Sequence, residues 1–196
     1  MDERLKKQLD FLLEIDKEKE IYRQTHILGG KRRENDAEHA WHMAIMAFVL
    51  QEYANETVDV LRVMKMVLMH DLVEIYAGDT YAYDESGKET QRERELAAAE
   101  RIFGMLPEDQ GKEFRTIWDE FEEKKTPEAK FARMLDNYQP LSLNNANKGV
   151  DWRAHNVARS QVEKRNEISK EGSQVMGQVI ADIIEENVRK GNLRDA

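Results

Sequence analysis

Residues 64–79 read MKMVLMHDLVEIYAGD, and this stretch decides how the chain is interpreted. Up to Met69 its apolar residues have the three-and-four spacing of a helix that packs into a core. Where that pattern calls for more apolar residues, the chain instead carries a histidine and three carboxylates: His70, Asp71, Glu74 and Asp79. Burying unpaired carboxylates is costly, and a shared divalent cation would remove that cost for the whole group.

Two polar residues from other predicted helices are able to join this group. His39 lies among apolar residues in ENDAEHAWH (34–42), and Asp136 lies on the apolar face of FARMLDNYQP (131–140). Singly, each has an ordinary structural explanation, such as a hydrogen-bonded core histidine or an aspartate paired with an arginine. The chain has no cysteine, so a metal must be held by nitrogen and oxygen. Two imidazoles and two carboxylates suit a first-row divalent ion, which lowers the pKa of bound water from about 15.7 toward 7.

The composition predicts a single helical domain that spans residues 1–196. With 40% hydrophobic residues, 35% charged residues and only three prolines, it favours an all-α fold. A net charge of −9 argues against nucleic-acid partners, because phosphate contacts need a clustered basic surface. No apolar run approaches the roughly 20 residues that cross a bilayer, and the start MDERLKKQLD lacks the apolar segment of a secretory signal. We therefore expect a cytoplasmic protein without membrane contact.

Helical periodicity covers most of the chain, and no segment shows the convincing alternation of a strand. The predicted helices lie at about residues 2–20, 35–55, 57–77, 89–105, 107–125, 127–141, 153–169 and 172–190. The last of these is expected to pack on its own domain or against a second subunit. Two irregular stretches are interpreted as loops: RQTHILGGKRREN (23–35) and GDTYAYDESGKE (78–89). A long polar loop beside a helix end is often functional.

Three blocks, ENDAEHAW (34–41), HDLVEIYAGD (70–79) and LDNYQP (135–140), resemble the motifs of the metal-dependent phosphohydrolases of the HD domain superfamily. The resemblance is to the branch that contains the bacterial 5′-deoxynucleotidases, and it covers roughly residues 5–170. It implies an all-α helical bundle, usually a homodimer, that holds one divalent ion through His39, His70, Asp71 and Asp136. The ion expected is Mn, Co, Zn, Fe, Ni or Mg, because these ligands do not select one of them.

The same resemblance implies roles for three further residues. Glu74 and Asp79 match residues that the branch needs for hydrolysis, where they position or deprotonate the attacking water and organise the phosphate and sugar of the substrate. The sequence does not say which residue does which. Arg23 matches an arginine that holds the nucleotide, but the tryptophan that normally follows is missing here. Selection of deoxyribose over ribose therefore does not follow from the resemblance.

The expected reaction is hydrolysis of the 5′-phosphate of a nucleoside or deoxynucleoside monophosphate, a small-molecule substrate. Two alternatives stay open. The same metal centre also serves HD hydrolases that act on nucleoside triphosphates or guanosine alarmones. A helical module that binds nucleotides without turnover would retain the same residues as a structural site.

Three other histidines have less specific interpretations. His42 follows His39 by three positions and is expected in the core or behind the ligands. His26 lies in the glycine-containing loop and is expected to be exposed to solvent, and His155 is expected to be structural.

Overall fold

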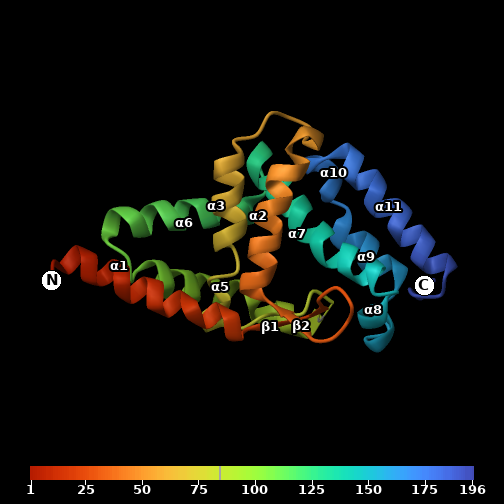
Figure 1. The fold of residues 1–196 in the computed structure, drawn as a ribbon, viewed down its shortest axis with the longest axis horizontal. Helices are drawn as coiled ribbons and strands as arrows, with labels where there is room; N and C mark the ends of the chain where they lie inside the picture. The colour runs from red at the N-terminus through yellow and green to blue at the C-terminus, as the bar shows by residue number, and fades with distance from the viewer. Residues whose placement is uncertain (84) are drawn as a thin grey trace.

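The computed structural model describes residues 1–83 and 85–196, with the side chains of residues 85–88 outside the description. Most of these residues are helical, which confirms the predicted all-α class. Figure 1 shows an elongated molecule, with the N-terminus at one end and the last helices at the other. The longer helices are α1 (Glu3–Glu14), α2 (Asp36–Leu50), α3 (Val60–Met69), α5 (Glu85–Phe103), α6 (Glu108–Glu123), α7 (Pro127–Ala146) and α11 (Gln174–Arg189). The short 3₁₀ helices η1 (Ile15–Glu20) and η2 (Gln51–Tyr53) follow α1 and α2.

Helices α2, α3 and α7 contact one another at the centre of the bundle (Figure 1). Each begins at a polar cap that accepts a hydrogen bond from the first helical turn: Asn35 for α2, Asp59 for α3 and Thr126 for α7. Asn35 and Glu38 form a reciprocal capping box. The facing sides of the three helices contribute to the larger apolar core. Any polar side chain on these facing sides is therefore buried.

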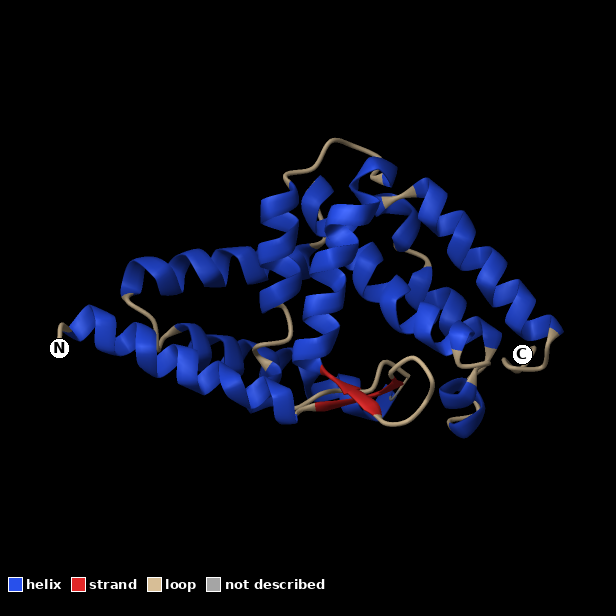
Figure 2. Cartoon of the chain, viewed as in Figure 1, coloured by secondary structure: helices blue, strands red, loops and turns tan. Residues whose placement is uncertain are grey.

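A short antiparallel hairpin crosses one side of this core, and Figure 2 shows its two strands. Strand β1 (Tyr22–His26) pairs with β2 (Arg33–Asn35), so the prediction of a loop without strands over residues 23–35 is wrong. The strands have only five and three residues, too few to show a clear alternation in the sequence. The hairpin matters because β2 leads directly into α2 and β1 carries Arg23.

The helix predicted over residues 57–77 is interrupted at the histidine–aspartate pair. Helix α3 ends at Met69, and a turn leads into the short helix α4 (Glu74–Ala77). Gly78 ends α4 with a φ of 76°, a left-handed conformation that glycine adopts without steric cost, which confirms the predicted stop. His70 and Asp71 therefore lie at a helix end, where adjacent side chains are free to lean toward the same point.

The C-terminal third differs from the predicted helices in its boundaries. Helix α7 continues through Pro140 to Ala146, beyond the predicted end at Leu141. The helix predicted at 153–169 is three short helices, α8 (Val150–Ala154), α9 (Arg159–Asn166) and α10 (Ser169–Gly172). Helices α8, α9 and α11 contribute to a second, smaller apolar cluster beside α7.

The predicted loop over residues 78–89 is shorter in the structure, because α5 already begins at Glu85. Its residue Asp84 lies outside the described residues. Across residues 1–83 and 85–196, none of the helices combines the length and apolar character that crossing a bilayer requires.

Candidate metal centre

Three polar side chains from three helices meet in the core. His39 comes from α2, His70 from the end of α3 and Asp136 from α7, and all three are buried. One possible ligand atom from each lies within 4.8 Å of the others. Nε2 of His39 is 3.2 Å from Oδ1 of Asp136, and Nε2 of His70 is 3.8 Å from the same oxygen. Residues that are up to 97 positions apart in the sequence thus converge on one point.

The contacts of Nδ1 in His39 and His70 indicate that Nε2 is the nitrogen free to coordinate a metal at the point where the side chains meet. Nδ1 of His39 lies 2.9 Å from Oε1 of Gln139, and Nδ1 of His70 lies 2.9 Å from the carbonyl oxygen of Val67. Because a carbonyl oxygen only accepts, we assign the proton to Nδ1 in both rings, which leaves a lone pair on Nε2. Nε2 of His70 has no hydrogen-bond partner among the described residues. Two lone pairs beside a carboxylate oxygen fit a shared cation, and the oxygen held by each Nδ1 fixes the ring for coordination.

The charges around the cluster favour the same interpretation. Burial, with a contribution from Arg23, lowers the pKa of His39 to about 4, so this imidazole is neutral and able to coordinate near neutral pH. Burial opposes the ionisation of Asp136, but His39, Arg133 and Arg165 lower its pKa well below the usual value. Burial also opposes the charging of His70, yet Asp71 outweighs it and raises the pKa of His70. A proton or a metal ion at Nε2 of His70 would neutralise the carboxylate of Asp71 equally well.

Asp71 lies beside this cluster and shares its carboxylate with an arginine. Its Oδ2 is 3.0 Å from Nε2 of His70 and 4.0 Å from Nε2 of His39. The same oxygen accepts a hydrogen bond from Arg23 at 2.7 Å. The structure therefore brings the four predicted metal ligands together. It also places Arg23 in the wall of the cavity, where its side chain is only 13% exposed.

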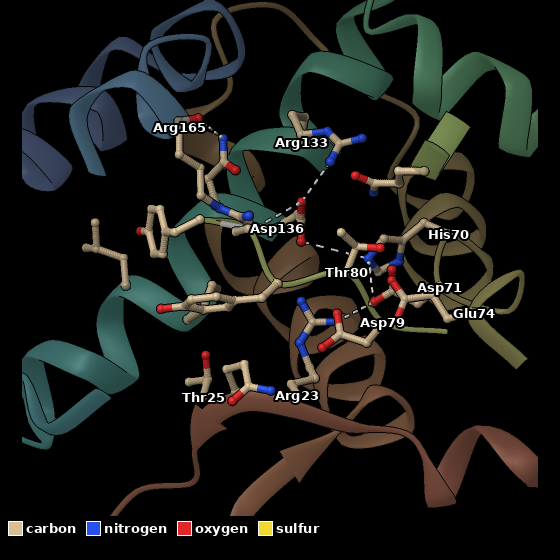
Figure 3. Close-up of a pocket in the computed structure, with 18 of the residues that line it drawn as sticks. Arg23, Thr25, His70, Asp71, Glu74, Asp79, Thr80, Arg133, Asp136 and Arg165 are labelled. Carbon is tan, nitrogen blue, oxygen red and sulfur yellow. Dashed lines mark hydrogen bonds and ion pairs between the residues drawn. The ribbon is translucent and has the colours of Figure 1, made fainter. Parts of the chain in front are cut away.

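The two residues predicted to act in hydrolysis lie on the rim of the same site (Figure 3). Oε2 of Glu74 is buried and unpartnered in the described part of the chain, and burial with the charges of Asp71 and Asp36 raises the pKa of Glu74 well above its usual value. Burial likewise raises the pKa of Asp79, which follows Gly78 directly. Carboxyl groups with raised pKa values in a cleft are candidates for proton transfer near neutral pH.

Two residues behind the candidate ligands, Gln139 and Arg133, were not predicted from the sequence as part of the site. Gln139 holds His39 through Oε1 and donates from Nε2 to Glu34, 2.6 Å away, and to Nδ1 of His42, 3.2 Å away. The prediction that His42 lies behind the ligands agrees with this contact. Arg133 donates to Oδ2 of Asp136 at 2.9 Å. The signal available in the sequence is that Arg133 and Gln139 each lie three positions from Asp136, where a helix places neighbours on the same face.

The two remaining histidines lie beyond the centre. Nδ1 of His26 is 2.6 Å from Oδ1 of Asp151, and the His26 backbone N–H donates to the other oxygen of that carboxylate. The prediction of a solvent-exposed His26 is wrong, since the side chain is 29% exposed and joins the hairpin to α8. The ring of His155 packs against Tyr81, with centroids 4.8 Å apart, as expected of a structural residue.

A cavity of about 410 Å³ opens over the cluster, within the usual size range of small-molecule sites. Figure 3 shows Arg133 and Arg165 approaching Asp136 from one side, with Arg23 and Asp79 on the other. Nη2 of Arg165 is 3.9 Å from Oδ2 of Asp136. Carboxylates at the floor and guanidinium groups around them would accommodate a cation together with an anionic ligand.

The fold and the buried histidine–aspartate cluster are those of an HD domain. A model of the HD domain family matches residues 15–176, most of the chain, and the chain belongs to this family. This finding confirms the resemblance stated from the sequence motifs.

Three known proteins resemble this chain to different degrees. The crystal structure of a predicted metal-dependent phosphohydrolase from Magnetospirillum magnetotacticum has 46% sequence identity and a TM-score of 0.93, covering 97% of this chain and 96% of that chain. The PH0347 protein of Pyrococcus horikoshii, with 21% identity and a TM-score of 0.65 over 92% of this chain and 98% of that chain, shows the shared fold alone. Human 5′-deoxynucleotidase HDDC2 is 33% identical over 111 residues, which are 57% of this chain and 53% of that protein. The match thus spans about half the length of this curated relative.

Proposed function

We propose that the protein is a divalent-metal-dependent phosphohydrolase that removes the 5′-phosphate of nucleoside or deoxynucleoside monophosphates. The observation that carries the proposal is the buried cluster of two histidine Nε2 atoms and an Asp136 oxygen within 4.8 Å, at the floor of a cavity large enough for a small ligand. The similarity to a metal-dependent phosphohydrolase and to proteins named 5′-deoxynucleotidase supports the substrate class.

His39, His70, Asp71 and Asp136 would hold one divalent ion. When bound, the ion supplies positive charge beside the phosphate and lowers the pKa of a bound water. Arg23 reaches Asp71 from the hairpin and is placed to donate to phosphate oxygens beside the ion. Stabilising charge on the equatorial oxygens is the main task of a phosphoryl-transfer site, and it requires groups held in place beforehand.

Glu74 and Asp79 would handle the proton of the attacking water and the phosphate and sugar end of the substrate. Two substitutions separate these roles from metal binding. Asp71→Ala is expected to abolish both metal content and turnover, whereas Glu74→Ala is expected to keep the metal and lose turnover. Metal content measured by plasma mass spectrometry, alongside phosphate release, tests both. An active, metal-free Asp71→Ala protein would refute the scheme.

The substrate range is tested by one panel on the purified protein. Nucleoside monophosphates, triphosphates and phosphodiesters are compared with several divalent ions, and release of phosphate from monophosphates alone supports the proposal. Hydrolysis of triphosphates or alarmones would favour an HD hydrolase with another nucleotide substrate. Nucleotide binding without hydrolysis would favour a helical binding module without turnover. Ribose and deoxyribose substrates are compared as well, because the tryptophan that normally follows the arginine in the related branch is missing after Arg23.

The proposal includes a homodimer and a cytoplasmic location. One face of α2 exposes a row of large apolar side chains: Trp41, Ile45, Phe48 and Val49, which are 63%, 46%, 54% and 62% exposed. A continuous apolar face of this kind is typical of an interface. Light scattering on the eluted protein should give twice the chain mass, and Phe48→Glu should shift it to the monomer. Cell fractionation tests the location.

A further inference from the structure

The cavity extends beyond the metal centre into an end with a different character. Past Asp136 its walls are formed by α7, α9, α8 and the segment that follows Asp79. They carry amide and aromatic side chains, Asn144, Asn166, Tyr81, Tyr83 and Trp152, beside two charged residues, Asp151 and Arg165, which face His26 and Asp136. This end lies next to the proposed phosphate position, and no role in hydrolysis accounts for its residues.

Two asparagines at this end have an acceptor without a partner. Asn144 and Asn166 are 5% and 6% exposed, and Oδ1 of each has no hydrogen-bond partner within the described chain. Their amide nitrogens are occupied, because Asn144 donates to the carbonyl oxygen of Pro140 at 3.1 Å and Asn166 to that of Val162 at 2.8 Å. Since those carbonyl oxygens only accept, the amides cannot be reversed, and both Oδ1 atoms remain acceptors. A buried acceptor left unpaired destabilises the fold, so a ligand that donates hydrogen bonds would be favoured here.

The two acceptors lie at different depths from the metal centre. The carbonyl oxygen of Arg165, the neighbour of Asn166, accepts a hydrogen bond from Asn137, which puts Asn166 near the level of Asp136. Asn144 follows Asp136 by eight positions on α7, about 12 Å along the helix axis. A ligand whose phosphate lies at Asp136 would therefore meet Asn166 first and Asn144 further along.

The remaining walls favour a flat, partly apolar group. The rings of Tyr81 and Tyr83 meet edge to face with centroids 5.3 Å apart, and both residues line the cavity together with Leu141 and Trp152. Aromatic side chains beside hydrogen-bonding groups are how proteins bind unpaired nucleobases.

We propose that this polar and aromatic end is the nucleoside subsite, in which Oδ1 of Asn166 accepts a hydrogen bond from a sugar hydroxyl and Oδ1 of Asn144 from an N–H of the base. The inference deepens the proposed function and rests on it, because it takes the phosphate to lie at the metal centre. It makes the two asparagines specificity residues, distinct from those that hold the ion.

The test uses nucleosides, which have no phosphate to hydrolyse, and reads binding by calorimetry on the intact protein. Wild type should bind adenosine about tenfold more tightly than 2′,3′-dideoxyadenosine, which lacks the 2′- and 3′-hydroxyl groups of the sugar, and Asn166→Leu should remove this difference. Wild type should likewise prefer adenosine to purine riboside, which lacks the amino group of the base, and Asn144→Leu should remove that preference. A control is Asn187→Leu on α11, a buried asparagine away from the cavity, which should keep both preferences.

The outcomes separate this inference from the proposed function. Equal binding of all three nucleosides by the wild type overturns the inference, even if nucleotides are hydrolysed, and this result does not require any variant to fold. The predicted preferences without hydrolysis of any phosphate ester would uphold the subsite and refute the hydrolase. In the hydrolysis reaction, Asn166→Leu should raise the KM for adenosine 5′-monophosphate about tenfold more than the KM for ethyl phosphate, which has no sugar, and change kcat little.

Discussion

The guanidinium group of Arg23 lies 2.7 Å from Oδ2 of Asp71, and the same nitrogen lies 3.0 Å from Oδ1 of Asp36. The proposed phosphate-binding residue is thus held by a proposed metal ligand, inside a core where the Asp36 side chain is fully buried. A bound ion would take over the neutralisation of Asp71. Arg23 would then be freer to turn toward a phosphate, so metal binding and substrate binding would be coupled through one carboxylate.

The first prediction concerns the stability that Arg23 provides. Arg23→Gln leaves Asp71 and Asp36 buried without their cation, and we expect the free energy of unfolding to fall by about 3 kcal/mol in EDTA. With saturating manganese the loss should be clearly smaller, because the ion neutralises Asp71. Urea denaturation under both conditions measures the two values.

A matched control for this prediction is Arg62→Gln. Arg62 pairs with Glu120, and the two side chains are 39% and 14% exposed. Because Arg62 is solvated and Glu120 keeps a hydrogen bond from Thr126, the loss should stay at about 1 kcal/mol and be the same with and without metal. An equal loss for Arg23→Gln in both conditions would show that the ion does not act on Asp71.

The second prediction concerns Gln139, which holds Nδ1 of His39 at 2.9 Å. Gln139→Leu keeps the volume but frees the ring and removes the acceptor that sets its tautomer. Loss of such a group behind a metal ligand is expected to weaken metal affinity about 10–100-fold. Calorimetric titration with manganese measures the affinity, and Gln178→Leu, at an exposed position that bonds Asp182, serves as a control without effect. Unchanged affinity in Gln139→Leu would contradict the assigned tautomer.

The third prediction concerns the stabilisation that the ion provides. At a free metal concentration of 100 times Kd, binding to the native state alone adds about 2.7 kcal/mol. For a chain of this length that corresponds to a rise in Tm of about 5–10 °C. Thermal unfolding with EDTA and with manganese measures the shift, and His70→Ala should abolish it. A shift that survives in His70→Ala would place the stabilising ion elsewhere.

The fourth prediction concerns Glu18, a buried carboxyl group on η1 with Oε1 unpartnered among the residues described. Burial, with the charges of Asp71 and Asp36, raises the pKa of Glu18 from 4.5 to about 8. Between these two pKa values the native state keeps a proton that the unfolded chain releases. The contribution of Glu18 to the free energy of unfolding therefore falls as the pH rises from about 4.5 to 8, and it falls no further above pH 8. Each unit of difference in pKa corresponds to about 1.4 kcal/mol.

Glu18→Gln carries the same hydrogen-bonding shape without the ionisation. In EDTA its free energy of unfolding should exceed that of the wild type by an amount that grows between pH 5 and pH 8. Chemical denaturation at a series of pH values measures the difference, in which the titration of all other groups largely cancels. Parallel curves for the two proteins would contradict the raised pKa of Glu18.

The parts of the fold that were predictable are those that short-range patterns determine. The helical periodicity of α2, α3 and α7 and the stop at Gly78 can be seen within single windows of sequence. The hairpin could not be predicted in this way, because β1 and β2 are held by pairing with each other and by the core beneath Arg23. The same limit applies to the breaks between α8, α9 and α10, which follow the packing against α7.

The site shows the same division. Polar residues in apolar helical patterns, together with the resemblance to the HD domain motifs, predicted His39, His70, Asp71 and Asp136 as candidate ligands, and the fold brings these four side chains together. The residues that hold or surround these ligands depend on contacts across the fold, and Gln139 and His39 are 100 positions apart. An unpartnered amide oxygen such as that of Asn166 has no signature in the sequence at all, because only the folded chain shows that the acceptor lacks a donor.

The central claim is that side chains from separate helices share one divalent ion. Crystals grown with manganese, with anomalous diffraction recorded near the manganese edge, test it most directly. We predict one strong anomalous peak within coordination distance of His39, His70, Asp71 and Asp136. A fully metal-loaded protein whose anomalous peak lies away from these four side chains would contradict the account.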